Sequence, residues 1–162
     1  MFDRFGEMTC GELNELAENL FNEGDLNSIY ALAEENGIAE EFVKAYISGD
    51  TAELCDPLTA ALGKIGIEKA DMKPTHLMKD WVSYLEALCL KDEEFAISVR
   101  EKNRNLKGCI AALLKYSFSN RIRVDADIVK AAGISNARVD FGVPGIAEAK
   151  KIIRKYYLGG EK

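Results

Sequence analysis

The chain has 162 residues, of which 48% are apolar and 30% charged, and its formal net charge is −6. This length and composition exclude a disordered tail and favour one globular domain or two small lobes. The longest uninterrupted apolar run, residues 109–114, is far shorter than the ~20 residues of a membrane span. Because the N-terminus is acidic and lacks the apolar segment of a signal peptide, we expect a cytosolic protein without membrane contact.

The first fifty residues are predicted to form three short helices separated by glycines. Thr9 and Glu12 have the spacing of a capping box, which indicates a helix start. Apolar residues then recur at helical spacing, and Gly37 suits the end of the second helix. The expected helices cover about 10–22, 26–36 and 39–48.

The next forty residues are expected to contain a lobe boundary and the central core helix. A short helix over about 51–63 contains Pro57, which should bend or split it. Residues 63–72 are interpreted as irregular. Pro74 suits the first position of the following helix, whose broad apolar stripe makes it the central core helix.

The remainder is predicted to be helical, with little room for strands. Four helices are expected: one from Asp92 to about Asn103, one after Asn105, one capped by Asp125, and one over about 145–158. The only candidate strands are short, at 121–124 and 137–143. The sequence therefore predicts an all-α fold, a compact bundle of about eight to nine helices. It forms either a single helical domain over 1–162 or two lobes, an acidic one over 1–65 and core helices with a basic C-terminal part over 72–162.

The charge is strongly polarised along the chain. Residues 1–99 hold 21 acids and 7 bases, whereas residues 100–162 hold 6 acids and 14 bases. No Lys or Arg occurs between Arg4 and Lys44. The simplest interpretation of these acidic residues is that they lie on solvated helix faces. However, Glu34 and Glu35 fall in the last turn of their expected helix, where carboxylates oppose the helix dipole. We therefore predict a partner-binding acidic surface made of Glu12, Glu15, Glu18, Glu23, Asp25, Glu34, Glu35, Glu40 and Glu41.

The basic C-terminal half offers two weaker nucleic-acid motifs. The segment "DIVKAAGISNARV" (127–139) resembles the first helix and turn of a helix-turn-helix, although Gly142 and Pro144 leave little room for a recognition helix. The segment "VPGIAEAKKII" (143–153) is similar to a helix-hairpin-helix, with Ala147 in place of the second glycine. For this second segment the alternative is a plain loop that enters the last helix. Candidate nucleic-acid-binding residues are Arg121, Arg123, Lys150, Lys151, Arg154 and Lys155.

Signals for an enzyme, a metal or a cofactor are poor. The single His76 allows no obvious acyl-transfer triad, and neither a phosphate-binding glycine loop nor a metal-ligand helix occurs. The cysteines show no CxxC pair. We expect no catalytic residues, no metal and no cofactor. Three or four of the cysteines, at positions 10, 55, 89 and 109, should be buried thiols in a reducing compartment.

Three segments together resemble one known family. They are "MFDRFGEMTCGELNELAENLFNEGDLNSIYALAEENGI", "NLKGCIAALLKYSF" and "VPGIAEAKKIIRKYYLGG". The family is that of anti-CRISPR proteins of phages and mobile elements that inhibit the type II RNA-guided DNA nuclease, and it is grouped with PcfK-like proteins of conjugative elements. The resemblance covers nearly the whole chain but assigns no site residues. It implies a phage or mobile-element protein that acts in the bacterial host cell.

The resemblance and the charge pattern lead to one main hypothesis and two alternatives. The nuclease holds its guide–target duplex in a basic channel and reads its recognition dinucleotide with arginines. An acidic helical surface could occupy either place and so block target-DNA engagement. The first alternative is a nucleic-acid-binding accessory protein of a mobile element that uses the basic C-terminal helix. The second is a homo-oligomer in which the acidic part of one subunit meets the basic part of the next.

Overall fold

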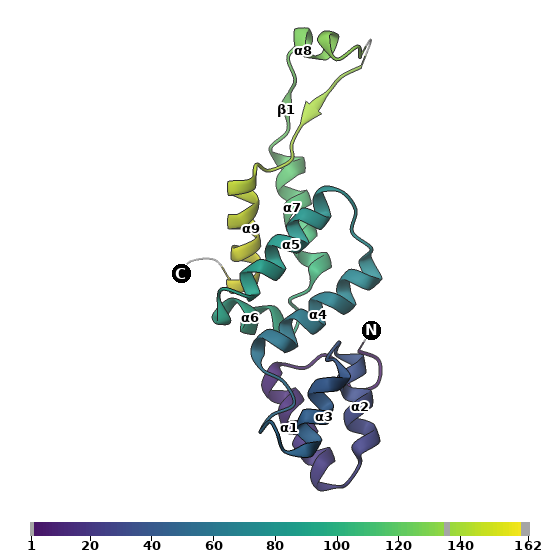
Figure 1. Cartoon of the computed structure of the whole chain (residues 1–162). Coiled ribbons are helices and arrows are strands. Elements are labelled where there is room, and N and C mark those ends of the chain that lie inside the picture. Colours follow the sequence, from purple (N-terminus) through teal and green to yellow (C-terminus); the bar gives the residue numbers. More distant parts are fainter. Residues whose placement is uncertain (1, 135–136, 160–162) are drawn as a thin grey trace. The chain divides into compact units, whose positions relative to one another are not determined.

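The computed structural model describes residues 2–134 and 137–159, which contain nine helices and one two-stranded sheet (Figure 1). The prediction of an all-α fold is confirmed. The chain divides into two compact units, residues 1–107 and 108–162. We refer to them as unit 1 and unit 2.

Unit 1 begins with three short helices that share one apolar core. They are α1 (Cys10–Asn22), α2 (Leu26–Glu35) and α3 (Glu40–Ser48). The predicted capping box is present, since the Thr9 side chain accepts from the backbone N–H of Glu12 while the Glu12 side chain accepts from that of Thr9. Because the apolar residues recur at helical spacing, each helix has one apolar face, and this face packs inward, away from water. The buried side chains of the three helices include Leu13, Ala17, Ile29, Leu32 and Val43.

The fourth helix, α4 (Pro57–Met72), differs from the sequence-based expectation. Pro57 lies at its first position rather than inside it, and Asp56 caps it by accepting from the backbone N–H of Thr59 at 2.7 Å. The helix continues through residues 63–72, which were expected to be irregular. The expected lobe boundary near residue 65 therefore lies inside a continuous helix.

A close backbone crossing fixes the end of α2 against α4. Gly37 has a φ of +69°, and a Cβ placed on it would lie 2.5 Å from the carbonyl oxygen of Gly63. A Cβ on Gly63 would in turn collide with the backbone of Asn36. Only glycine fits both positions, so the two helices meet without side chains between them.

Two further helices complete the core of unit 1 around α4. They are α5 (Leu77–Cys89) and α6 (Glu93–Arg100), and both pack against α4 and against each other. The α5 helix begins three residues after Pro74, so this proline precedes the helix instead of opening it. Val82, Leu85 and Leu88 of α5 are buried, in agreement with the predicted core role of this helix.

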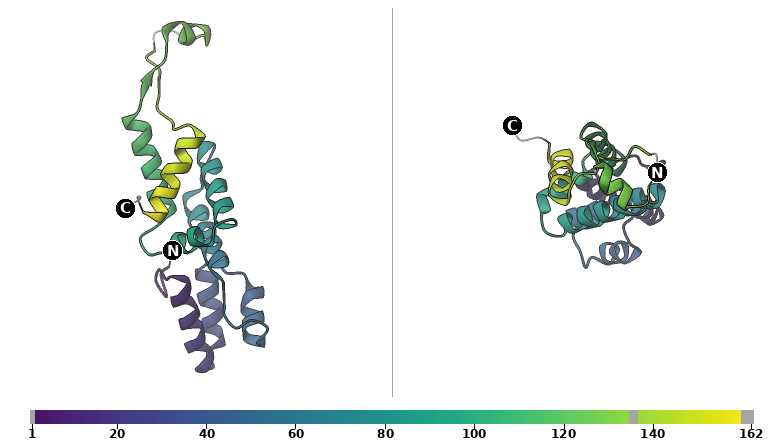
Figure 2. Two further views of the ribbon diagram at one scale, coloured as in Figure 1. Left: turned by 90° about the vertical axis from the view of Figure 1, so that its left-hand side faces the viewer. Right: turned by 90° about the horizontal axis from the view of Figure 1, so that it is seen from above.

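Unit 2 is a helical hairpin with a small β-arm. The α7 helix (Leu106–Ser119) leads into it, followed by β1 (Ile122–Arg123), α8 (Ala126–Ala131), β2 (Asp140–Phe141) and α9 (Ile146–Leu158). Figure 2 shows α7 and α9 side by side, with the β1–α8–β2 arm extending beyond them. The strands are antiparallel, and Ile122 pairs with Phe141. The Tyr156 side chain of α9 packs directly on Gly108 of α7, where any Cβ would collide with it.

Candidate functional site

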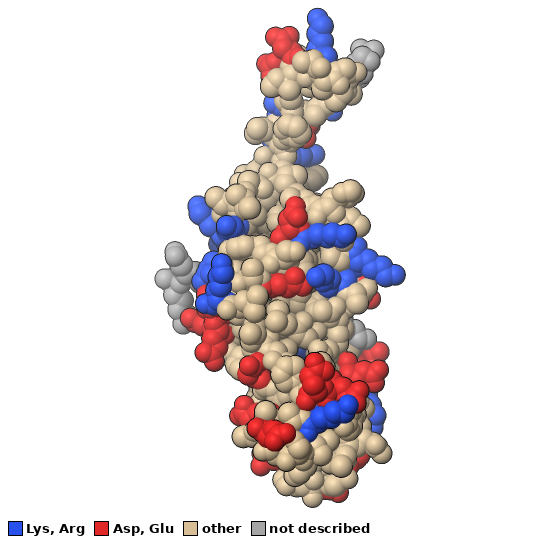
Figure 3. Space-filling model, in the orientation of Figure 1, with Lys and Arg blue, Asp and Glu red and all other residues tan. Residues whose placement is uncertain are grey.

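The nine predicted carboxylates all belong to α1–α3 or to the residues that cap these helices. Residues 5–63 contain thirteen acids and a single base, Lys44. Figure 3 shows acidic side chains gathered over this part of unit 1. The structure separates the nine into carboxylates that bind groups of unit 1 and carboxylates that do not.

Glu12 and Asp25 serve as local helix caps. Besides its capping bond, Glu12 accepts from Lys102 Nζ at 2.5 Å. The hydrogen bonds from Lys102 and Thr9 lower the pKa of Glu12 to about 2. Asp25 caps α2 by accepting from the backbone N–H of Ser28 at 3.1 Å and from its hydroxyl at 2.6 Å. These two carboxylates stabilise helix starts.

Glu35 and Glu40 also have partners inside unit 1. Glu35 accepts from the backbone N–H groups of Arg4 and Phe5, at 2.9 and 3.2 Å, and so attaches the N-terminal segment to α2. Glu40 forms an i,i+4 ion pair with Lys44 at 2.7 Å. Because both side chains of that pair are exposed, it contributes little stability.

The other five carboxylates remain exposed to solvent, and the described residues provide no hydrogen-bond or ion-pair partner for them. We call this set the acidic face; it consists of Glu15, Glu18, Glu23, Glu34 and Glu41. Glu34 lies in the last turn of α2, where the negative end of the helix dipole disfavours it. Glu41 lies in the first turn of α3, where the helix dipole favours a carboxylate, but none of the five accepts a hydrogen bond or forms an ion pair within the described residues. The acidic face is therefore the strongest candidate surface for a cationic partner.

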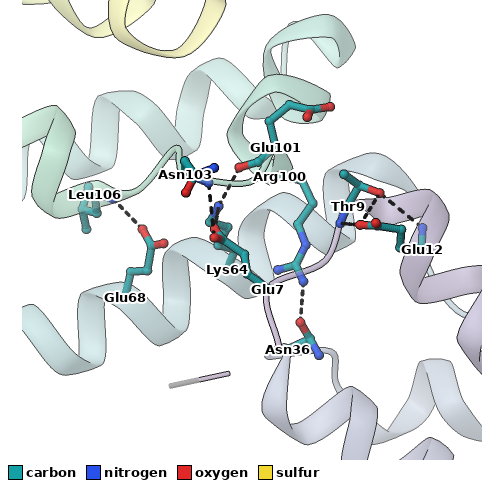
Figure 4. A network of polar contacts seen from close by, with 10 residues as sticks. All are labelled: Glu7, Thr9, Glu12, Asn36, Lys64, Glu68, Arg100, Glu101, Asn103 and Leu106. Atoms are coloured by element: carbon teal, nitrogen blue, oxygen red, sulfur yellow. Dashed lines mark hydrogen bonds and ion pairs between the residues drawn. The ribbon is translucent and has the colours of Figure 1, made fainter. Parts of the chain in front are cut away.

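The interior of unit 1 holds a polar network that the sequence did not reveal (Figure 4). Lys64 of α4 is fully buried, and its Nζ donates to Glu7 Oε1 at 2.6 Å and to the carbonyl oxygen of Glu101 at 3.0 Å. The other Glu7 carboxylate oxygen accepts from the backbone N–H of Asn103 at 3.2 Å. Burial alone would raise the pKa of Glu7, but the bonds from Lys64 and Asn103 lower it. The network connects the N-terminal segment, α4 and the residues that follow α6.

Arg100 is a second buried cation, only 1% exposed. Its Nη2 donates to Asn36 Oδ1, and Asn36 Nδ2 donates to the carbonyl oxygen of Leu32 at 2.8 Å. Nε and Nη1 of Arg100 have no hydrogen-bond partner among the described residues, and the guanidinium lies 5.5 Å from the ring centre of Phe2. Burial lowers the pKa of Arg100. An arginine has no accessible neutral form, so this charge stays in the core.

Glu68 lies beside a small cavity of about 160 Å³. Its Oε2 accepts from the backbone N–H of Leu106 at 2.6 Å, whereas Oε1 has no partner among the described residues. Burial raises the pKa of Glu68. The cavity is lined by Phe2, Glu7, Glu68, Asp71, Asn105 and Lys107. A space of this size holds a few waters, and its lining carries no nucleophile–base pair.

The predicted nucleic-acid-binding residues of unit 2 fall into two groups. Arg121 and Arg123 lie on the arm, where the Arg121 guanidinium stacks 4.1 Å from the ring centre of Phe118 and its Nε donates to the Phe118 carbonyl oxygen. The other four are on α9, where Lys151 forms a long ion pair of 3.6 Å with Glu148. The basic residues of α9 are Lys150, Lys151, Arg154 and Lys155.

The helix-turn-helix interpretation is wrong. The first helix of the motif, α8, has only six residues, and the described part of residues 132–145 contains no second helix. Instead, residues 140–141 form β2. The motif resembling a helix-hairpin-helix does enter a helix, because Gly145 is the N-cap of α9. A plain loop that enters α9, the alternative interpretation of this segment, fits that geometry equally well.

The cysteines are free thiols: Cys55, Cys89 and Cys109 are buried and Cys10 is half-buried, as expected. The described residues contain no cluster of His, Cys, Asp and Glu able to hold a metal ion. Over the same residues, no helix is long and apolar enough to cross a membrane. Compared with family models, curated proteins and solved structures, the chain shows no significant match to any of them.

Proposed function

We propose that this protein is an anti-CRISPR protein, a non-enzymatic inhibitor that binds a type II RNA-guided nuclease through the acidic face. The observation that carries the proposal is the set of five exposed carboxylates without partners in the described structure. The resemblance of the sequence to the anti-CRISPR family supplies the class of partner.

The electrostatic fit to a nucleic-acid channel supports this mechanism. The channel of such a nuclease presents lysines and arginines to the phosphate backbone of a guide–target duplex. Helices that present exposed carboxylates can occupy such a channel and exclude DNA. Because Glu12, Asp25 and Glu35 provide the capping and the N-terminal attachment, the acidic face can bind a partner without loss of either.

Charge reversal on the acidic face tests the proposal. The variant changes Glu15, Glu18, Glu23, Glu34 and Glu41 to Lys. A matched control reverses two exposed acids of α6, Glu93→Lys and Glu94→Lys. At roughly 0.2–1 kcal/mol per exposed ion pair, losing five contacts should weaken binding to purified nuclease at least about fivefold.

The measurement is inhibition of DNA cleavage, together with a pull-down of nuclease with and without guide RNA. We expect the five-residue variant to lose inhibition while circular dichroism shows unchanged helicity, and the α6 control to inhibit normally. A variant with five glutamines should fall between them, because it removes charge without reversing it. Full inhibition by the folded five-lysine variant would refute the role of the acidic face.

A second candidate function, nucleic-acid binding by unit 2, is favoured by the exposed bases on the arm and on α9. It predicts that the protein alone shifts DNA or RNA in a gel. Log K should then fall with log salt by roughly 0.7–0.9 per phosphate contact. Lys150→Glu with Lys155→Glu should abolish the shift. The inhibitor function predicts little binding to nucleic acid without the nuclease.

Self-association of acidic and basic surfaces remains the third candidate. It predicts a mass larger than the 17.9 kDa monomer in light scattering at low salt, and the monomer mass at high salt. The inhibitor function requires no such change in mass.

A further inference from the structure

Two cysteines far apart in sequence meet at the start of α1. Cys10 is the first residue of α1 and half-buried, whereas Cys55 is 3% exposed in the segment that joins α3 to α4. Asn14 holds this segment on α1, since its Nδ2 donates to the Cys55 carbonyl oxygen at 2.9 Å and its Oδ1 accepts from the Cys55 backbone N–H at 3.1 Å. The position of Cys55 beside α1 is therefore fixed by two backbone hydrogen bonds.

The two sulfur atoms share this small polar site. Cys10 Sγ lies 3.6 Å from the carbonyl oxygen of Cys55, and Cys55 Sγ lies 3.6 Å from Asn14 Oδ1. Asn14 Nδ2 also approaches Cys10 Sγ at 3.9 Å. Both sulfurs therefore lie within 4 Å of the same Asn14 side-chain amide, and a disulfide requires side chains in such proximity.

The two thiols differ in reactivity. The neighbouring Cys55 thiol lowers the pKa of Cys10, although burial opposes it. The N-terminus of a helix, where Cys10 lies, also favours a thiolate. The neighbouring Cys10 thiol, together with burial, raises the pKa of the Cys55 thiol. Cys10 is thus the accessible nucleophile and Cys55 the protected thiol beside it.

We propose that Cys10 and Cys55 are a peroxide-sensitive dithiol that forms a reversible disulfide. The Cys10 thiolate attacks one oxygen of hydrogen peroxide, and the O–O bond breaks to leave a sulfenic acid and, after protonation, water. The Cys55 sulfur then attacks the Cys10 sulfur, the S–OH bond breaks, and the Cys55 proton leaves with the hydroxide as a second water. Overall, two thiols and one peroxide give one disulfide and two waters.

The disulfide would join two helix starts across 45 residues of sequence. It closes a loop that contains all of α2 and α3, and so restricts the unfolded chain. The carboxylates of the acidic face have no contact with this site in the structure. The proposal therefore goes beyond the proposed function and does not depend on it.

The test treats the reduced wild-type protein with stoichiometric hydrogen peroxide, blocks free thiols with iodoacetamide and maps peptides by mass spectrometry. We expect a Cys10–Cys55 cross-link, two unreacted thiols at Cys89 and Cys109, and a mass about 2 Da below that of the reduced chain. The melting temperature should rise by roughly 5–10 °C and return after dithiothreitol.

Two variants identify the order of the steps. In Cys55→Ser, Cys10 should accumulate as a sulfenic acid that dimedone traps, because the second thiol is missing. In Cys10→Ser, Cys55 should resist peroxide as Cys89 does. The proposal is overturned if wild-type protein gives no 10–55 cross-link, or if Cys89 and Cys109 are oxidised at the same rate as Cys10.

Discussion

Replacing Lys64 with methionine removes a fully buried cation and keeps a side chain of similar length. In the variant, Glu7 and the Glu101 carbonyl oxygen lose their shared donor, Lys64 Nζ, which lies 2.6 and 3.0 Å from them. Glu7 then keeps only the hydrogen bond from the backbone N–H of Asn103. Removing one member of a buried ion pair costs about 3–5 kcal/mol. Because the Glu7 side chain is 29% exposed and water can replace part of the lost interaction, we expect a loss near the lower limit, about 3 kcal/mol.

Urea unfolding followed by circular dichroism at pH 7 measures this loss, and the melting temperature should fall by roughly 6–12 °C. Adding Glu7→Gln to Lys64→Met should restore at least about 1 kcal/mol, because an amide oxygen still accepts from Asn103 and leaves no unpaired charge. The matched control is Lys69→Met, which breaks the exposed 2.8 Å pair with Glu86 and should cost at most about 1 kcal/mol.

The pH dependence gives a second readout of the same pair. The folded-state pKa of Glu7 is lowered, so its stabilising contribution is present above the unfolded pKa, about 4.3, and is lost as pH falls through the folded value. Lys64→Met removes the principal hydrogen bond that lowers this pKa. The variant should therefore lose less stability than the wild type between pH 5 and pH 2. A loss below about 1 kcal/mol at pH 7, with unchanged acid sensitivity, would refute the reasoning.

Three further substitutions test local features of unit 1. Gly37→Ala should cost roughly 2–4 kcal/mol in urea unfolding, because its Cβ would meet the Gly63 carbonyl oxygen at 2.5 Å. The control is Gly49→Ala, also at positive φ but with open space around it, which should cost about 1 kcal/mol. Thr9→Ala should cost about 1 kcal/mol by removing the capping box, and an unchanged urea midpoint would contradict that role. Burial raises the folded-state pKa of Glu68, so its carboxyl contributes most stability below the unfolded pKa, and this contribution is lost as pH rises through the folded value. Glu68→Gln should therefore become more stable relative to the wild type as the pH rises from about 4 to about 7. Parallel pH profiles of the two proteins would contradict this assignment.

Most helices were predictable because their signals are local. The capping box of Thr9 and the glycine after α2 lie within a few residues of the ends they determine. The start of α4 was missed because Pro57 was interpreted as an interruption, although Asp56 before it is an N-cap. Its second half was missed because Lys64 and Glu68 face the interior and break the apolar pattern. Their partners come from distant segments that no local pattern identifies.

The candidate site was predictable as a region but not residue by residue. Composition located the excess of carboxylates in α1–α3. It could not show that Glu12 binds Lys102, which is 90 residues away, or that Glu35 binds the backbone near the N-terminus. A useful signal within the sequence was position relative to the helix, because Glu34 in the last turn of α2 has no capping role, whereas Asp25 at the N-cap position has one.

The burial of Lys64 and Arg100 has a consequence for how dissolved salt acts on this protein. Mobile ions screen charges that solvent reaches, with a Debye length of about 8 Å at physiological ionic strength, and have little effect on cations enclosed in the core. Rising ionic strength should therefore weaken the proposed binding of a cationic partner to the carboxylates of α1–α3, while the resistance of the fold to urea stays nearly constant. The two properties can be separated by ionic strength alone.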